Sequence, residues 1–234
     1  MSLPKIQYPI HSIKLPSTKK LLNFRPYLVK EEKILLMAKE SGETIDILRA
    51  IKQIVGNCCI DSKFNINDIT TTDLSYLFLQ IRAFSVDNKV NQTYKDKEDE
   101  KEYNFTIDLT KIEVKQDKEV DNNIKINKDI TIVMKYPTTN MYDNDSIDVN
   151  DTMNYDIITK CIDKIYNNNE IFDTKTHSRQ ELIEFVENLT IKALESIMEF
   201  LNNAPRLEYI IEYKNSKGND RNIVLNTLND FFIF

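Results

Sequence analysis

The spacing of apolar positions changes along the chain, from a helical period to an alternating one and back again. Between residues 29 and 86, apolar side chains recur every three or four positions in three short runs, as expected of amphipathic helices. We expect the first helix to end before Gly42. Thr44 then opens a second helix that should stop at Gly56, and a third is expected from about Thr72. These stripes predict a compact helical unit with a core rather than a cofactor site.

An alternating pattern follows these helices. Residues 103–109 and 130–136 carry apolar side chains at every second position, which predicts half-buried strands. The charged run 95–102 lies just before the first of them, and its mixed signs favour a solvated hairpin tip over a binding site. The middle of the chain is therefore expected to form antiparallel hairpins.

The second half of the chain repeats this order of helices and then strands. Residues 153–165 show one helical stripe, Ser178 begins a capping box, and Thr190 is placed to cap a helix that ends before Pro205. Alternating apolar positions return on both sides of a turn at residues 215–218. Helices and strands in separate blocks predict an α+β fold.

The expected layout has five parts. They are an extended arm (1–28), an amino-terminal helical unit (29–86), a central β-hairpin region (87–137), a second helical unit (138–205) and a carboxy-terminal β-hairpin with an aromatic tail (206–234).

The arm has two interpretations. Pro26 disfavours helical geometry at Arg25, so the chain should be extended as it enters the first helix. In one interpretation, Tyr27 and the two apolar residues after it pack under that helix as a hydrophobic staple. In the other, the arm lies on the sheet edge of another subunit. The apolar residues of the arm are Ile6, Ile10, Ile13 and Leu15.

Composition and charge narrow the function classes. The formal net charge of −6 and the pI of about 5.2 argue against a broad basic face for nucleic acid. The sequence has neither a membrane-length apolar run nor the layout of a signal peptide, so we expect no membrane association and a location in the cytoplasm. Cys58, Cys59 and Cys161 are interpreted as small buried apolar residues.

The sequence offers little for catalysis. Its two histidines, His11 and His177, fall in expected connecting segments, and phosphate-binding, dinucleotide-binding and metalloprotease motifs are absent. The acidic stretch 143–148 does not fit a calcium loop, because Ile147 stands at a ligand position. We therefore predict no enzyme activity, no cofactor and no metal site.

Several blocks of the sequence are similar to one protein family. They are LPSTKKLLNFRPYLVKEEKILLMAKES (15–41), LSYLFLQIRAFSV (74–86), VMKYP (133–137), CIDKIY (161–166), ELIEFVENLT (181–190) and LNDFF (228–232). In these blocks the chain resembles the small baseplate hub proteins of T4-like contractile-tailed phages. None of the blocks is a catalytic signature.

The resemblance implies a protein that builds or holds the central hub of a contractile tail by binding other hub and tail proteins. Its location would be the tail baseplate of the virion, and the host cytoplasm during assembly. A transient assembly chaperone is the alternative, and copy number and oligomeric state stay open. A peptidoglycan-cutting enzyme is disfavoured because the chain has no tryptophan. The residues expected to contact partners are Ile10, Ile13, Phe24, Arg25, Tyr27, Phe231 and Phe232, with Phe234 close by.

The chain departs from some members of this family in its two hairpins. Those relatives carry Cys-x-x-Cys pairs that look like a zinc ribbon, whereas residues 94–97 and 214–218 here contain no cysteine. We therefore expect no structural zinc. If the two hairpins still pair, we expect Tyr, Phe and Ile contacts alone to hold them.

Overall fold

The chain forms two compact units in the computed structural model, which describes residue 4 and residues 6–143 and 155–231. Unit 1 combines residues 1–115 with 206–234, and unit 2 is the continuous segment 116–205. Each unit has a hydrophobic core of its own. Helices and small antiparallel sheets confirm the predicted α+β class. The two units differ from the five expected parts, because strands before residue 137 belong to unit 2.

Unit 1 contains four helices, two short 3-10 turns and seven strands within the described residues. In chain order they are β1 (His11–Lys14), β2 (Leu21–Phe24), α1 (Val29–Ser41), α2 (Thr44–Cys58), η1 (Ile66–Asp68), α3 (Thr71–Ser85), β3 (Lys89–Lys95), β4 (Glu102–Asp108), η2 (Leu109–Lys111), β5 (Glu113–Lys115), β10 (Arg206–Lys214), β11 (Asp220–Leu225) and α7 (Leu228–Phe231).

Part of the expected arm is a β-hairpin. β1 and β2 pair antiparallel, with His11 opposite Phe24 and Lys14 opposite Leu21. Leu22 and Phe24 are fully buried in the core of unit 1. Lys19, in the turn between the strands, adopts a positive φ of 59°, and no glycine marks this turn in the sequence. The prediction of an extended arm over residues 1–28 is therefore wrong from His11 onward.

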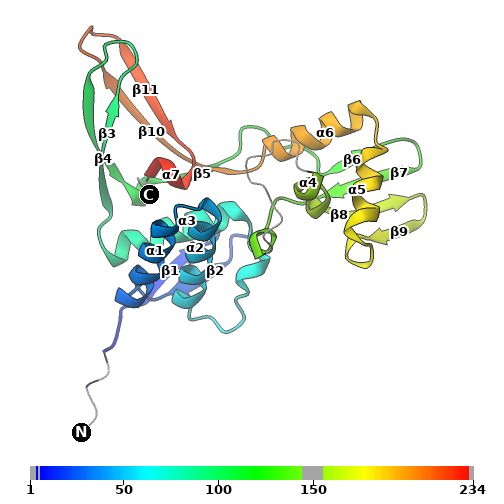
Figure 1. Cartoon of the computed structure of the whole chain (residues 1–234), viewed down its shortest axis with the longest axis horizontal. Helices are drawn as coiled ribbons and strands as arrows, with labels where there is room; N and C mark the ends of the chain where they lie inside the picture. The colour runs from blue at the N-terminus through cyan, green and yellow to red at the C-terminus, as the bar shows by residue number, and fades with distance from the viewer. Residues whose placement is uncertain (1–3, 5, 144–154, 232–234) are drawn as a thin grey trace. The chain divides into compact units, whose positions relative to one another are not determined.

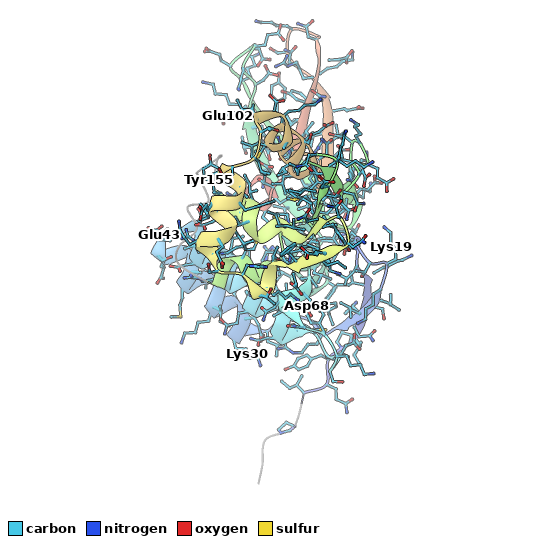
Figure 2. The ribbon with its side chains drawn as sticks, turned by 90° about the vertical axis from the view of Figure 1, so that its right-hand side faces the viewer. Lys19, Lys30, Glu43, Asp68, Glu102 and Tyr155 are labelled. Atoms are coloured by element: carbon cyan, nitrogen blue, oxygen red, sulfur yellow. The ribbon has the colours of Figure 1, made fainter. Side chains whose placement is uncertain are left out.

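The three helices after this hairpin lie close to their expected positions. α1 ends at Ser41, and Gly42 follows it in the left-handed conformation with φ of 74°. α2 does not stop at Gly56, as the sequence predicts, but continues to Cys58. Packing of α2 against the core outweighs the cost of a glycine inside a helix. Lys30 and Glu43, near the ends of α1, both lie at the periphery of unit 1 (Figure 2).

Two hairpins from distant parts of the sequence lie side by side in unit 1 (Figure 1). One is β3–β4, and the other is β10–β11, which forms a three-stranded sheet with β5 in the order β11-β10-β5. Ile107, Leu207 and Leu225 from these strands join the core of unit 1. The sequence predicted β4, β10 and β11 but not the short helix α7 that follows them.

Unit 2 contains a four-stranded antiparallel sheet in the order β6-β7-β8-β9. Its described elements are β6 (Asn123–Lys125), β7 (Ile130–Met134), η3 (Thr139–Asp143), α4 (Tyr155–Cys161), β8 (Ile162–Asn167), β9 (Glu170–Asp173), η4 (Thr174–Thr176), α5 (Arg179–Glu187) and α6 (Ile191–Asn202). α5 and α6 lie across one face of the sheet (Figure 1), where Val186, Ile197 and Phe200 pack with Ile132 in the core.

The helix expected over residues 153–165 is shorter in the structure. Its described part is α4, which ends at Cys161, and Ile162 begins β8. The four apolar positions between 157 and 162 fit a helical period. The chain nevertheless becomes a strand from Ile162, because β8 pairs with both β7 and β9. The Ser178 capping box and the Thr190 cap are both confirmed. The acidic stretch 143–148 lies almost entirely outside the described residues.

Candidate interaction surface

Two isoleucines of the expected arm are strongly exposed. Ile6 is 72% exposed and Ile10 is 61% exposed, and Tyr8 between them is 38% exposed. All three precede β1, where the chain leads away from the hairpin (Figure 1). Ile10 is thus the one predicted contact residue whose apolar side chain faces solvent in the described part of the chain.

Three other predicted contact residues belong to the core of unit 1. Ile13 and Tyr27 are buried and Phe24 is fully buried, all within one hydrophobic cluster. The Tyr27 hydroxyl also accepts a hydrogen bond of 2.8 Å from the Arg82 guanidinium. Burial raises the pKa of Tyr27 to about 12. Val29 does not complete the expected staple, because its side chain is exposed.

Arg25 forms a buried ion pair inside the chain. Its guanidinium donates to both carboxylate oxygens of Glu31, at 2.8 and 3.3 Å, and to the carbonyl oxygen of Asn57 at 3.0 Å. Burial raises the pKa of Glu31, but hydrogen bonds from Arg25 and from the Leu28 N–H outweigh burial, so the pKa is lowered overall. Arg25 therefore fixes the entry to α1.

Phe231 corrects the expectation for the aromatic tail. The sequence predicts that Phe231 and Phe232 contact a partner, because exposed aromatic side chains are costly in solution. Phe231 is instead fully buried in the core of unit 1, as the last residue of α7. The Tyr94 hydroxyl donates to the carbonyl oxygen of Asp230 at 3.0 Å and links α7 to β3. Phe232 and Phe234 lie outside the described residues.

α1 exposes an apolar face that sequence analysis did not single out. Val29, Leu36 and Met37 are exposed and share one side of the helix with Lys33 and Glu40. The opposite side also carries apolar residues, which pack on the core. Because α1 is apolar on both sides, its sequence pattern does not separate the exposed apolar residues from those that pack on the core. A cluster of exposed apolar side chains is typical of a surface that binds another protein.

The tips of the two long hairpins are joined by a polar network, which we call the hairpin clasp. Its centre is the buried carboxylate of Asp96 at the end of β3. Asp96 accepts hydrogen bonds from the Tyr213 hydroxyl at 2.5 Å, from the Arg221 Nε at 3.1 Å and from the Glu98 N–H at 2.7 Å. The bond from Tyr213 is the main cause that lowers the pKa of Asp96.

Two more carboxylates of the β3–β4 tip extend the hairpin clasp. Asp99 accepts from the Tyr103 hydroxyl at 2.6 Å and from the Ser216 N–H at 2.9 Å. Glu98 accepts from the side-chain amides of Asn215 and Asn219, at 2.7 and 2.6 Å. The turn between β10 and β11 therefore wraps the acidic tip of the other hairpin with hydrogen-bond donors.

The hairpin clasp changes two expectations. The charged run 95–102 is a hairpin tip, as predicted, but several of its carboxylates are bound by the other hairpin rather than by water alone. The two hairpins do contact each other without cysteine, through Phe105 and Tyr103 packed on Tyr213 with ring centroids 5.1 and 5.0 Å apart. Polar bonds hold them as well, so the expectation of aromatic and aliphatic contacts alone is wrong.

The two histidines lie against aromatic rings, and the three cysteines are buried or half-buried. His11 stacks on Phe84 with ring centroids 4.0 Å apart, and His177 lies just before α5 beside Phe172. Cys58 and Cys161 are buried and Cys59 is half-buried. Among the described residues, no group of three or more His, Cys, Asp or Glu side chains is arranged to hold a metal ion, and no helix could span a membrane.

Comparison with known proteins gives one family. The family model for the T4 bacteriophage base plate protein matches residues 8–233, which is nearly the whole chain. No match is found among curated proteins or among solved structures.

Proposed function

Because the chain belongs to the T4 bacteriophage base plate protein family, we propose that it is a structural subunit of the central hub of a contractile tail. Family membership makes it a structural baseplate protein of the virion tail, which interacts with other baseplate proteins. The finer assignment, to the hub and to the finished particle, is our proposal. The family match across both units is the observation that carries it.

The exposed apolar face of α1 supports a role in protein–protein contacts. Val29, Leu36 and Met37 are exposed on a helix that the Arg25–Glu31 ion pair fixes at its amino-terminal end. A rigid, preformed helix face loses little conformational freedom when a partner covers it. Met side chains adapt to irregular partner surfaces. This face is our candidate for the contact with a neighbouring hub protein.

The alternative is a chaperone that binds hub proteins during assembly and then leaves. Quantitative mass spectrometry of purified phage particles distinguishes the two roles, with an infected-cell lysate as the reference for expression. A structural subunit is expected in the particle at a constant ratio to other baseplate proteins. Abundance in the lysate together with absence from particles would replace the structural role by the chaperone role.

Copurification from infected cells tests the α1 face directly. We expect the double variant Leu36→Asp/Met37→Asp to lose other baseplate proteins, because two carboxylates would have to be desolvated in the contact. Val86→Asp, which changes another exposed apolar residue of unit 1, is the matched control. Copurification unchanged in the double variant would exclude the α1 face as the contact.

A further inference from the structure

The residues before β1 form an extended segment with one apolar side. Ile6, Tyr8 and Ile10 occupy alternate positions, so in an extended chain they share a face. The segment continues β1 beyond the end of β2, because His11 already pairs with Phe24, the last residue of β2. No backbone hydrogen bond joins residues 6–10 to the rest of the described chain.

Proline positions restrict how this segment can pair. Successive residues of a strand direct their N–H and C=O groups to opposite sides, and a proline has no N–H to donate. Pro9 therefore weakens the side that it shares with Gln7. The opposite side keeps the complete backbone groups of Ile6, Tyr8 and Ile10. Residues 6–10 can thus join a sheet through one side only.

β9 offers a matching sheet edge in unit 2. In the described part of the chain, β9 pairs only with β8 and is the last strand of its sheet. Phe172 of β9 is half-buried and lines a pocket, whereas Ile171 faces the other side of the sheet and is 61% exposed. An edge strand presents unpaired N–H and C=O groups, to which another extended segment can bind.

An apolar pocket of about 270 Å³ lies beside this edge, between the sheet and α5. Its apolar lining includes Ile165 and Phe172 from the sheet and Leu182 and Phe185 from α5. Phe172 belongs to β9 itself, so a strand added along β9 would place alternate side chains at the pocket. Backbone pairing with pockets for alternate side chains is the usual mode of strand addition.

The charges of the two elements are also complementary. Glu170 and Asp173 stand at the two ends of β9, and both are exposed. Between residues 4 and 10, Lys5 is the one charged residue in the sequence, and it is basic. Residues 6–10 are themselves uncharged, so an apolar segment preceded by a lysine meets no like charge from these two carboxylates.

We propose that residues 6–10 of one copy of this chain add as a strand to β9 of a second copy, with apolar side chains of the segment entering the pocket beside α5. Each copy carries one donor segment and one acceptor edge, so the contact is head-to-tail. The proposal does not depend on the baseplate assignment.

Mixing two full-length variants tests this proposal. The donor variant is Ile6→Asp/Ile10→Asp and the acceptor variant is Leu182→Glu, at a residue that lines the pocket. Sedimentation velocity should show that wild-type protein associates as its concentration rises, while each variant alone associates at least about tenfold more weakly. An equimolar mixture should form a dimer, because the intact donor of one variant meets the intact acceptor of the other.

Two controls keep the result specific. Ile191→Asp changes an isoleucine of unit 2 that is 78% exposed and lies outside the pocket, so this variant should associate like the wild type. Thermal melts of each variant report folding, and Phe185→Glu provides a second acceptor variant inside the pocket. Wild-type protein that stays monomeric at all concentrations, or a variant mixture that does not dimerise, would overturn the proposal.

Discussion

The Glu31 side chain is fully buried, and the guanidinium of Arg25 is the main partner of its negative charge. Arg25, whose side chain is 17% exposed, bonds both carboxylate oxygens. Lys30 also approaches Glu31, at 3.6 Å, but its side chain is 67% exposed. These two cations have the same charge and different burial, so they separate the effect of a buried ion pair from that of a surface ion pair.

We expect Arg25→Met to lower the free energy of unfolding by about 3 kcal/mol, because it leaves the buried carboxylate of Glu31 without its main partner. Lys30→Met should change it by less than about 0.5 kcal/mol, since exposed ion pairs contribute little. Urea unfolding measures both. The double variant Arg25→Met/Glu31→Leu should recover much of the loss, and a double variant no more stable than Arg25→Met would contradict this explanation.

The cysteines should differ in reactivity. Burial raises the pKa of all three thiols, to about 11 for Cys58 and about 12 for Cys161, but Cys59 is only half-buried and its thiol is more accessible. Because the thiolate is the reactive form, at pH 8 a thiol reagent should label Cys59 first and the other two only as the protein opens. Mass spectrometry of the labelled peptides gives the order, with urea-unfolded protein as the control. Equal rates for Cys161 and Cys59 in folded protein would argue against the burial of Cys161.

At the scale of elements, the hairpin clasp joins two hairpins through ionised carboxylates. The pKa of Asp96 is lowered in the folded protein, chiefly by the bond from Tyr213. A lowered folded pKa means that the carboxylate stabilises the fold fully above the ordinary Asp pKa of about 3.9. That contribution is lost as the pH falls through the lowered pKa.

Asp96→Asn should therefore be less stable than the wild type at neutral pH, and the difference should shrink as the pH falls below about 4. Thermal melts between pH 7 and pH 3 measure this. Asp220→Asn is the control, because Asp220 lies on β11 with its side chain 83% exposed and forms a surface ion pair with Lys214. A difference between wild type and Asp96→Asn that stays constant with pH would show that shape, and not charge, matters at Asp96.

Local signals in the sequence predicted the elements whose ends are set by local chemistry. Gly42 ends α1 and the Ser178 capping box begins α5, since both act within a few residues. The β1–β2 hairpin was missed because its turn has Lys19, rather than glycine, at a positive φ. β8 was predicted as helix because pairing with β7 and β9 depends on residues far away in the sequence.

The residues of the candidate surfaces could likewise be predicted only in part from the sequence. Ile10 was predicted as a contact residue, and the structure leaves it exposed. Phe24 and Phe231 were also predicted as contacts, but they fill the core of unit 1, because apolar residues of an interface and of a core look alike in a sequence. The hairpin clasp was missed because Asp96 and Tyr213 are separated by more than a hundred residues.

At the scale of the whole molecule, unit 2 is one continuous segment with its own core. We expect a fragment of residues 116–205 to fold alone and to show a cooperative thermal transition by circular dichroism. Ile132→Asp should abolish this transition, because Ile132 is fully buried in that core. A fragment that stays unfolded would show that unit 2 needs the rest of the chain.

Unit 1 is built from both sides of unit 2 in the sequence, and this arrangement sets an order of events during translation. Residues 1–115 leave the ribosome first, but β5 must wait for β10, and the β3–β4 tip for the turn that wraps it. Unit 2 is synthesised during this interval and can fold before its neighbour is complete. Until residues 206–231 emerge, the nascent chain presents Ile107 and Leu109 without their final cover, and a chaperone or protease of the host can bind them. Unit 1 can therefore be completed only after β10 and β11 have been translated.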